Sequence, residues 1–149
     1  MRAVVQRVEN ASIRVGGRLI SSIENGLLVY LGVEVGDDRD HAEYLLDKIL
    51  NLRIFEDDDG KMNISLLDRS YEMLVVSQFT LYGDCRKGRR PSFVAAEKPQ
   101  KAKILYDYFI SKAHEKTARV VGGEFQAMMK VELLNDGPVT ILLDSKKIF

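Results

Sequence analysis

The spacing of apolar residues constrains this fold most, because only two segments repeat them with a helical period. In residues 42–50 and 102–113, apolar side chains recur three or four positions apart, which places them on one face of a helix. The other apolar runs, such as residues 3–15, 27–33 and 73–81, are short and rich in Val, Ile and Leu, which predicts strands. Because strands and helices do not alternate regularly, we expect an α+β domain with a mixed or mostly antiparallel sheet and two main helices.

Turn and capping residues set the limits of several elements. Gly16-Gly17 predicts a hairpin that leads into a strand at residues 19–23. The pair Asp37-Asp38 is typical of a helix start. Pro99 is typical of the first position of the second helix, where a missing N–H costs nothing.

The sequence of the C-terminal part predicts two strands joined by a turn. Residues 125–133 place Phe, Ala, Met, Val and Leu at alternating positions, as in a strand with one buried face. The segment Asn135-Asp136-Gly137-Pro138 indicates a turn, and residues 139–143 predict the last strand. Earlier in the chain, residues 52–55 predict a short strand that ends in a turn at residues 57–60.

Length and composition favour one ordinary domain that covers residues 1–149. Lys plus Arg and Asp plus Glu both number 22, and this balance argues against a non-specific nucleic-acid binder but not against a local basic patch. The single cysteine, Cys85, excludes an intramolecular disulfide and favours a reducing cytoplasm. No apolar run approaches the roughly 20 residues of a membrane span. The first ten residues have no continuous apolar segment, so we expect no membrane partner and no secretory signal.

The residues of the common catalytic sets are scarce. The two histidines, His41 and His114, both lie in predicted helices, where a lone histidine is more often a surface or satisfied residue. A Ser-His-Asp or Cys-His hydrolase therefore has little support. Residues 57–60 are acidic but lack the spaced oxygen ligands of a calcium loop. We therefore expect neither a metal nor another cofactor.

Two segments carry polar or rigid residues that a plain fold does not require. Ser77-Gln78-Phe79-Thr80 places polar side chains in an apolar run, where they need partners or a function. Gly137-Pro138 is either an ordinary turn, which spacing alone favours, or a cis peptide, because the trans preference of an X–Pro bond is only about 0.5–1 kcal/mol.

Together these segments make the chain resemble the D-aminoacyl-tRNA deacylase family, also called the D-tyrosyl-tRNA deacylase family. The resemblance rests on two hallmark motifs, SQFTL at residues 77–81 and NDGPVT at residues 135–140. Both are intact and in the family's order. Further matches lie at residues 6–8, 26–29 and 90–93, so the resemblance covers essentially the whole chain. One departure is Met128, which stands where the family commonly has an aspartate.

The resemblance implies a barrel-like deacylase fold and a cytoplasmic homodimer. The expected partner of the protein is the 3′ end of aminoacyl-tRNA. The expected reaction is hydrolysis of the ester that joins a D-amino acid to the terminal adenosine. The products are free D-amino acid and tRNA, and the enzyme rejects L-aminoacyl-tRNA. Glycyl-tRNA, including glycine mischarged on tRNA-Ala, is also an expected substrate, because glycine has no side chain to clash. This is translation quality control.

The resemblance also implies roles for single residues. Catalysis is expected at Ser77, Gln78, Phe79 and Thr80, where backbone N–H groups stabilise the oxyanion. Gly137 and Pro138 are expected as a cis dipeptide that reaches across the dimer and acts as a chirality filter. Substrate binding is expected of Phe125 and Arg7, and tRNA contact of Arg86, Lys87, Arg89 and Arg90.

Several alternatives stay open on sequence alone. Thr80 either acts as a nucleophile or positions water through its hydroxyl, or it is a structural residue beside an assisting tRNA 2′-hydroxyl. Substrate assistance is favoured because the motif offers no evident base. Phe125 either lines the pocket or caps the adenosine by stacking, or it is a core residue of an alternating strand. The basic loop either contacts phosphate or is only solvated. A non-catalytic nucleic-acid-binding module and a small structural dimerisation domain are the other classes, against which the intact motifs argue.

Overall fold

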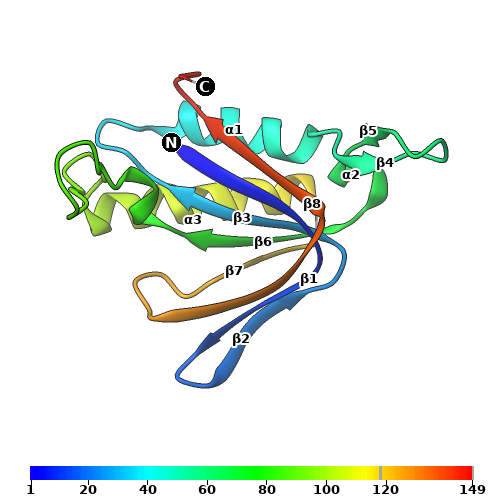
Figure 1. Cartoon of the computed structure of the whole chain (residues 1–149), viewed down its shortest axis with the longest axis horizontal. Helices are drawn as coiled ribbons and strands as arrows, with labels where there is room; N and C mark the ends of the chain where they lie inside the picture. The colour runs from blue at the N-terminus through cyan, green and yellow to red at the C-terminus, as the bar shows by residue number, and fades with distance from the viewer. Residues whose placement is uncertain (118, 149) are drawn as a thin grey trace.

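The computed structural model of the protein describes residues 1–117 and 119–148. Its elements form an α+β fold with a mixed, nearly closed sheet, which confirms the expected fold class (Figure 1). In chain order the elements are β1 (Arg2–Val15), β2 (Arg18–Ile23), β3 (Gly26–Gly32), α1 (Arg39–Asn51), β4 (Phe55–Glu56), β5 (Met62–Ile64), α2 (Leu66–Arg69), β6 (Glu72–Ser77), the 3-10 helix η1 (Phe79–Tyr82), α3 (Pro99–Lys116), β7 (Val120–Gly122) and β8 (Met129–Asp144).

Strand β1 organises the sheet, because it is long enough to pair with three other strands. β8 runs antiparallel along the whole of one edge of β1. On the other edge, β3 pairs with the first half of β1 and β2 with the second half. β6 adds to β3 in parallel, and β7 adds to β6 in parallel, so the sheet is mixed. The resulting curvature gives the barrel-like form seen in Figure 1.

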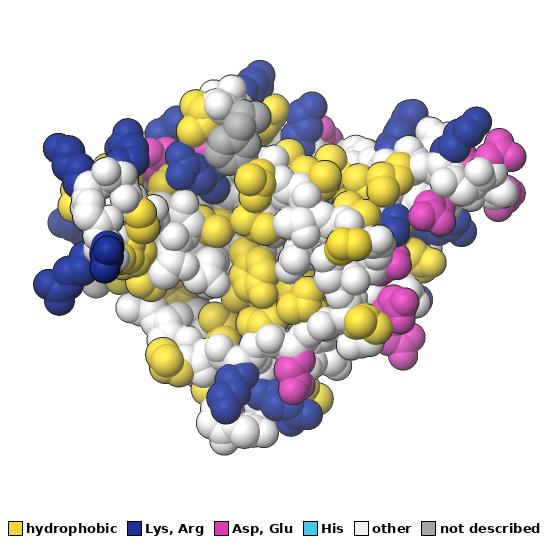
Figure 2. Space-filling model, in the orientation of Figure 1, with side chains coloured by type: hydrophobic (Ala, Val, Ile, Leu, Met, Phe, Trp, Pro, Cys, Tyr) yellow, Lys and Arg dark blue, Asp and Glu magenta, His cyan; other side chains and the backbone are white. Residues whose placement is uncertain are grey.

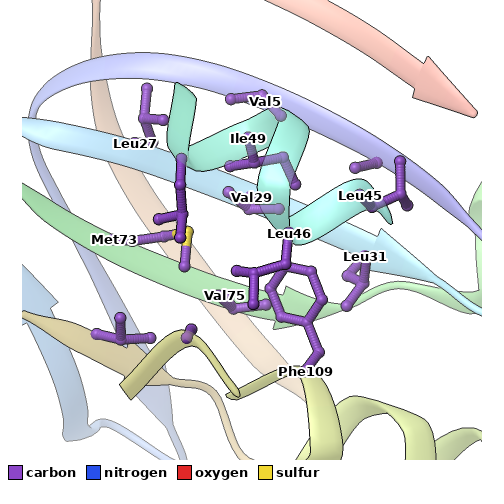
Figure 3. Packing of buried hydrophobic residues seen from close by; sticks show 14 of the residues in the cluster. Val5, Leu27, Val29, Leu31, Leu45, Leu46, Ile49, Met73, Val75 and Phe109 are labelled. Atoms are coloured by element: carbon purple, nitrogen blue, oxygen red, sulfur yellow. The ribbon is translucent and has the colours of Figure 1, made fainter. Parts of the chain in front are cut away.

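The two main helices cover one face of this sheet and form the larger core. In Figure 3, Leu46 of α1 and Phe109 of α3 lie over Val29 and Val75 of the central strands. The helical spacing is confirmed for α1, because its buried residues are Ala42, Leu45, Leu46, Ile49 and Leu50. Full burial of an aliphatic or aromatic side chain contributes about 1.5–3 kcal/mol relative to exposure, so this layer dominates the stability of the fold.

Both histidines are helix residues at the surface, as expected. Asp38 caps α1 by accepting a hydrogen bond from the backbone N–H of His41 at 3.2 Å, and the His41 ring lies 2.6 Å from the same carboxylate. These contacts lower the pKa of Asp38, the side-chain contact with His41 most of all. His114 is exposed in the last turn of α3. Neither residue lines the large pocket described below.

The short strand expected at residues 52–55 is wrong in its limits. Leu52 closes α1 by donating its N–H to the Ile49 carbonyl, so the chain leaves the helix before it can extend. β4 therefore comprises only Phe55–Glu56, paired with β5. The turn expected at residues 57–60 is confirmed, since Gly60 N donates to Asp57 O at 3.0 Å.

The central strand expected at residues 73–81 is too long. β6 ends at Ser77, and Gln78 donates its N–H to Leu31 O at 2.9 Å before the chain turns into η1. The neighbouring strands end here too, because β3 stops at Gly32 and β7 pairs only with residues 73–75. With no strand beside them, the last residues of the apolar run form a 3-10 turn. The polar motif thus lies at the carboxyl end of a strand and not within it.

The expected turn at residues 135–138 is a bulge inside one long strand. Val8 of β1 faces Asn135 and Gln6 faces Thr140, so residues 136–139 of β8 lie opposite Arg7 alone. The Asn135 side-chain amide closes the bulge by donating to Arg7 O at 2.8 Å and to Val139 O at 3.0 Å. The start of this strand also differs, because residues 125–127 form a turn in which Gln126 has a φ of 62° and β8 begins only at Met129.

Candidate active site

A pocket of about 700 Å³ lies at the carboxyl end of β6. One wall comes from Ser77, Gln78 and Phe79, and a second from Phe93 and residues 96–99, which lead into α3. A third comes from residues 125–129, which lead into β8. Hydrophobic side chains dominate its lining, and its described polar residues are Ser77, Gln78, Glu97, Lys98 and Gln126. This is the composition of a site that binds an organic group and orients it with a few polar contacts.

The sequence motif at residues 77–80 is only partly in this pocket. Ser77, Gln78 and Phe79 line it, but Thr80 is exposed and does not. The Gln78 side-chain amide donates a hydrogen bond to the Thr80 hydroxyl. Phe79 is 56% exposed and packs edge-on against Phe93, with ring centroids 5.0 Å apart. The first hydrogen bond of the 3-10 turn runs from Leu81 N to Gln78 O, so the N–H groups of Phe79 and Thr80 precede it.

Gly32 allows the motif to pack directly on the end of β3. A Cβ at this position would lie 3.0 Å from Gln78 O and 3.1 Å from the Tyr82 ring. Both distances are shorter than ordinary van der Waals contact, so any larger residue would displace the turn. The location of the motif backbone thus depends on the absence of a side chain at a strand end.

Phe125 lies between the pocket and the core. It lines the pocket, and its ring packs 5.8 Å from the ring of the core residue Tyr106. Tyr106 donates to Val75 O at 2.8 Å and accepts from Gly123 N at 3.1 Å, which fixes the chain just before Phe125. Burial raises the pKa of Tyr106 to about 12, so its hydroxyl stays protonated and keeps the donated hydrogen bond.

Arg7 and Gly137-Pro138 lie together but away from this pocket. The buried Arg7 guanidinium donates to Ile54 O at 2.7 Å and forms an ion pair with Asp136 at 2.7 Å. The peptide bond between Gly137 and Pro138 is cis. Arg7 and Asp136 border a separate hollow of about 200 Å³, which shares no lining residue with the large pocket. Within one chain, the two hallmark motifs are therefore not brought together.

The four basic residues expected to contact tRNA occupy an exposed loop between η1 and α3. Arg86 is neutralised by Asp84, whose carboxylate accepts from the guanidinium at 2.9 and 2.7 Å, and these bonds lower the pKa of Asp84 to about 2. No carboxylate in the described ranges forms an ion pair with Lys87, Arg89 or Arg90. Figure 2 shows Lys and Arg side chains at the left edge of the molecule, where this loop lies in Figure 1. Three positive charges of the loop, those of Lys87, Arg89 and Arg90, are thus available for a phosphate, and not four.

Part of the pocket was not found by sequence reasoning. Residues 96–99 form part of a wall, and within it the Glu97 side chain is only 7% exposed. The nearby segment Arg90-Pro91-Ser92-Phe93 carried a family resemblance, and Pro99 marked the helix start. These two sequence features lie at either end of the pocket wall, but they do not predict which residues of the segment contact the pocket. Met128, at the rim, is 91% exposed.

The described residues offer neither a metal-binding cluster nor a membrane-spanning helix. Across residues 1–117 and 119–148, no three His, Cys, Asp or Glu side chains form a group that could hold a metal ion. In the same ranges no helix combines the length and the apolar character that crossing a membrane requires.

Solved structures with this fold include two that differ widely in sequence. One, titled c-Myc DNA Unwinding Element Binding Protein, has a TM-score of 0.93 at 44% identity and covers 97% of this chain and 98% of its own. The other, titled as a probable eukaryotic D-amino acid tRNA deacylase, has a TM-score of 0.82 at 18% identity and covers 96% of this chain and 98% of its own. The chain therefore shares its fold with both of these proteins.

The sequence profile of the family described as D-Tyr-tRNA(Tyr) deacylase matches residues 4–144. The D-aminoacyl-tRNA deacylase of Syntrophus aciditrophicus is 63% identical over 149 residues, and that of Thermosipho melanesiensis is 61% identical over 150, each match covering 100% of both chains. The chain belongs to the D-Tyr-tRNA(Tyr) deacylase family, which confirms the family expected from the motifs.

Proposed function

We propose that this protein hydrolyses the ester bond of D-aminoacyl-tRNA to free D-amino acid and tRNA. The observation that carries the proposal is the pocket lined by Ser77, Gln78 and Phe79, in a chain 63% identical to a relative named for this activity. The substrate is the 3′ end of an aminoacyl-tRNA, whose charged form exists in the cytoplasm, so we place the protein there.

The chemistry asks for positioning and charge stabilisation more than for a strong nucleophile. An aminoacyl ester is activated, and a ribose hydroxyl adjoins its carbonyl. Water attack produces an oxyanion, and donors that are already in place stabilise it without reorganisation. The N–H groups of Phe79 and Thr80 suit this role, because they precede the first hydrogen bond of η1 at the pocket wall. Ser77 and the Gln78 side chain support that wall.

The environment of Thr80 favours assistance by the substrate's 2′-hydroxyl. The Thr80 oxygen accepts a hydrogen bond from the Gln78 amide, which draws electron density away from the oxygen. No His, Asp, Glu or Lys side chain in the described ranges forms a hydrogen bond with this hydroxyl. A threonine hydroxyl without a base is a poor nucleophile. Thr80 therefore orients the Gln78 amide, and the 2′-hydroxyl of the tRNA assists the attack of water on the ester.

Replacing Thr80 with alanine should leave the chemical step within about tenfold of the wild type, because no covalent intermediate forms on this residue. The measurement is single-turnover hydrolysis of D-Tyr-tRNA, with Thr80→Ser as the matched variant that keeps the hydroxyl. Loss of a true nucleophile costs ~10⁴-fold or more. A loss of that size in Thr80→Ala, with recovery in Thr80→Ser, would overturn substrate assistance.

The separation of the two motifs within one chain supports a homodimer with a shared site. Gly137-Pro138 lies beside Arg7 and outside the large pocket, so it acts only if it enters the pocket of a second copy. Leu134 and Leu142, on the same long strand, are 51% and 57% exposed. Figure 2 also shows hydrophobic side chains gathered at the centre of the face it displays. Sedimentation equilibrium tests this directly, and a monomer at assay concentration would contradict it.

The shared site explains how chirality is read. Rigid backbone close to the substrate Cα leaves room for hydrogen on one side and for a side chain on the other. An L-residue would place its side chain against Gly137-Pro138, and rejection by a clash needs no contact with the rest of that side chain. Many D-amino acids are therefore accepted. Glycine has no side chain to clash, so glycyl-tRNA, including glycine mischarged on tRNA-Ala, is hydrolysed as well.

The basic loop supplies the contact with tRNA phosphate. Replacing Lys87, Arg89 and Arg90 together with Gln should lower kcat/KM for D-Tyr-tRNA. It should also flatten the plot of log(kcat/KM) against log salt by about two units, because each phosphate contact contributes ~0.7–0.9 to that slope. A matched control replaces Lys48, Lys112 and Lys116, which lie on α1 and α3 and change the net charge equally. Equal slopes for the two triple variants would count against the loop.

The deciding assay incubates the protein with D-Tyr-tRNA, L-Tyr-tRNA and Gly-tRNA and follows ester loss. We expect hydrolysis of the D-form and the glycyl form, with the L-form at the spontaneous rate. Binding of tRNA without ester loss would instead indicate a non-catalytic binding module. Equal hydrolysis of D-Tyr-tRNA and L-Tyr-tRNA would refute the chirality filter but would still support ester hydrolysis.

A further inference from the structure

Arg2, near the N-terminus, contacts the motif at residues 77–81. Its guanidinium Nη1 donates to Leu81 O at 3.3 Å, and its Cζ lies 4.7 Å from the centre of the Tyr82 ring. Its Nε binds the Asp144 carboxylate at 2.9 Å, and that carboxylate is only 1% exposed. One planar group thus ties η1 to β1 and to the end of β8.

The far side of the turn is held by β3. The Tyr82 ring and Gln78 O both approach Gly32 so closely that a Cβ there would collide with them. Tyr82 is 3% exposed, and burial is the main cause that raises the pKa of its hydroxyl, so the ring is neutral. A neutral aromatic face is a good partner for a guanidinium. The turn is therefore held on one side by Gly32, at the end of β3, and on the other by the Arg2 guanidinium, which lies against the Tyr82 ring.

We propose that Arg2 is a positioning residue for the deacylation reaction. It holds η1 at the angle that directs the N–H groups of Phe79 and Thr80 toward the scissile ester. The inference rests on the proposed function of that motif. Donors that stabilise a transition state must be held within about 0.5 Å of the productive geometry, so a small tilt of a single turn lowers the rate. Arginine suits this role because its rigid fork reaches the carboxylate and the carbonyl while its face covers the ring, which a lysine ammonium does not do.

The test compares Arg2→Met with Arg14→Met. Arg14 lies at the other end of β1, pairs with Glu132 at 3.7 Å and donates to Gly17 O at 3.4 Å, but does not touch the motif. We expect Arg2→Met to lower kcat for D-Tyr-tRNA by about tenfold with little change in KM, because the donors are misaligned while the pocket remains. Arg14→Met should leave both parameters within about twofold. A kcat for Arg2→Met within twofold of the control would overturn the proposal.

Arg2→Lys separates positioning from simple ion pairing. Lysine keeps a positive charge for Asp144, so we expect it to restore the melting temperature but to leave kcat several-fold low. If Arg2→Lys restores kcat in full, the ion pair alone matters and the positioning role is wrong.

Hydrogen exchange provides a readout that does not depend on activity. The amides of Leu81 and Gly83 are hydrogen-bonded within the turn, to Gln78 O and Thr80 O. Their exchange should quicken about tenfold in Arg2→Met and not in Arg14→Met, because the turn opens locally. Equal protection in both variants would show that Arg2 does not hold the turn. A wild-type protein that does not hydrolyse D-Tyr-tRNA would refute the proposed function instead, and the exchange rates would still decide whether Arg2 holds the turn.

Discussion

A Gly137→Ala variant should lose at least about tenfold of its preference for D-Tyr-tRNA over L-Tyr-tRNA. Gly137 has a φ of +113°, where side chains other than hydrogen are strained by about 1–3 kcal/mol. Its added Cβ would lie 2.8 Å from Val139 Cγ2 and 3.0 Å from Arg7 Nη2. The bulge must shift to relieve these contacts. If the filter works by the location of this backbone, the shift opens space for an L side chain.

The measurement is kcat/KM for both enantiomers, together with glycyl-tRNA as an internal standard. Glycyl-tRNA cannot clash with the filter, so its rate reports any general damage to the site. Pro138→Ala is the companion variant, and it should change the ratio of the enantiomers more than it changes the stability of the fold. Sedimentation checks that the dimer persists. An unchanged ratio in both variants, with the dimer intact, would show that chirality is selected elsewhere.

The fold could be predicted where local pattern and tertiary packing agree. The apolar residues 42–50 repeat with the helical period, and all of the expected face of α1 is buried, since one face of an amphipathic helix has only the core to bury against. β3 was recognisable as a continuous apolar run because it is covered on both faces. In both cases a few neighbouring residues contain all of the information that the element needs.

The fold could not be predicted where partners distant in sequence decide the backbone. Asn135 to Pro138 has the composition of a turn, but β1 pairs with β8 on both sides of it and converts the turn into a bulge. The apolar run at residues 73–81 continues past Ser77, and only the ends of β3 and β7 determine where the strand stops. Local propensity is a weak prior in such places, because tertiary contacts override it.

The candidate site also has features that the local sequence predicts and features that depend on distant contacts. Its motif residues were recognisable because polar groups in an apolar run need a reason. The sequence does not show that Thr80 lies outside the pocket, that Asp84 neutralises Arg86, or that Arg2 contacts Leu81. Each of these depends on side-chain direction or on a contact between distant parts of the chain. Family resemblance supplied the roles of the motifs, but not the geometry that separates them within one chain.

Arg7→Met should destabilise the protein by about 2–4 kcal/mol and abolish most of its D-Tyr-tRNA hydrolysis. Arg7 is 5% exposed, and its loss leaves the Ile54 carbonyl without its donor and Asp136 without its cation. A buried acceptor left unsatisfied costs about 1–3 kcal/mol, and breaking a buried pair costs up to ~5 kcal/mol. Asp136 is 42% exposed, so water compensates part of the second cost, and the total falls below the sum. Urea unfolding measures this, with Arg14→Met as the exposed control expected within about 0.5 kcal/mol of the wild type.

Asp136→Asn then separates the stability of the fold from the orientation of the bulge. This variant keeps the hydrogen bond between Arg7 and Ile54 O but removes the ion pair that holds the residue just before Gly137. We expect a loss of stability of less than about 1 kcal/mol, because one partner is solvated. We also expect a clear fall in the ratio of D- to L-Tyr-tRNA hydrolysis, because the filter backbone is no longer fixed. If Asp136→Asn keeps the wild-type ratio while Arg7→Met unfolds easily, Arg7 serves the fold alone. If both variants lose the preference for D-Tyr-tRNA over L-Tyr-tRNA, the buried Arg7 determines where Gly137-Pro138 lies.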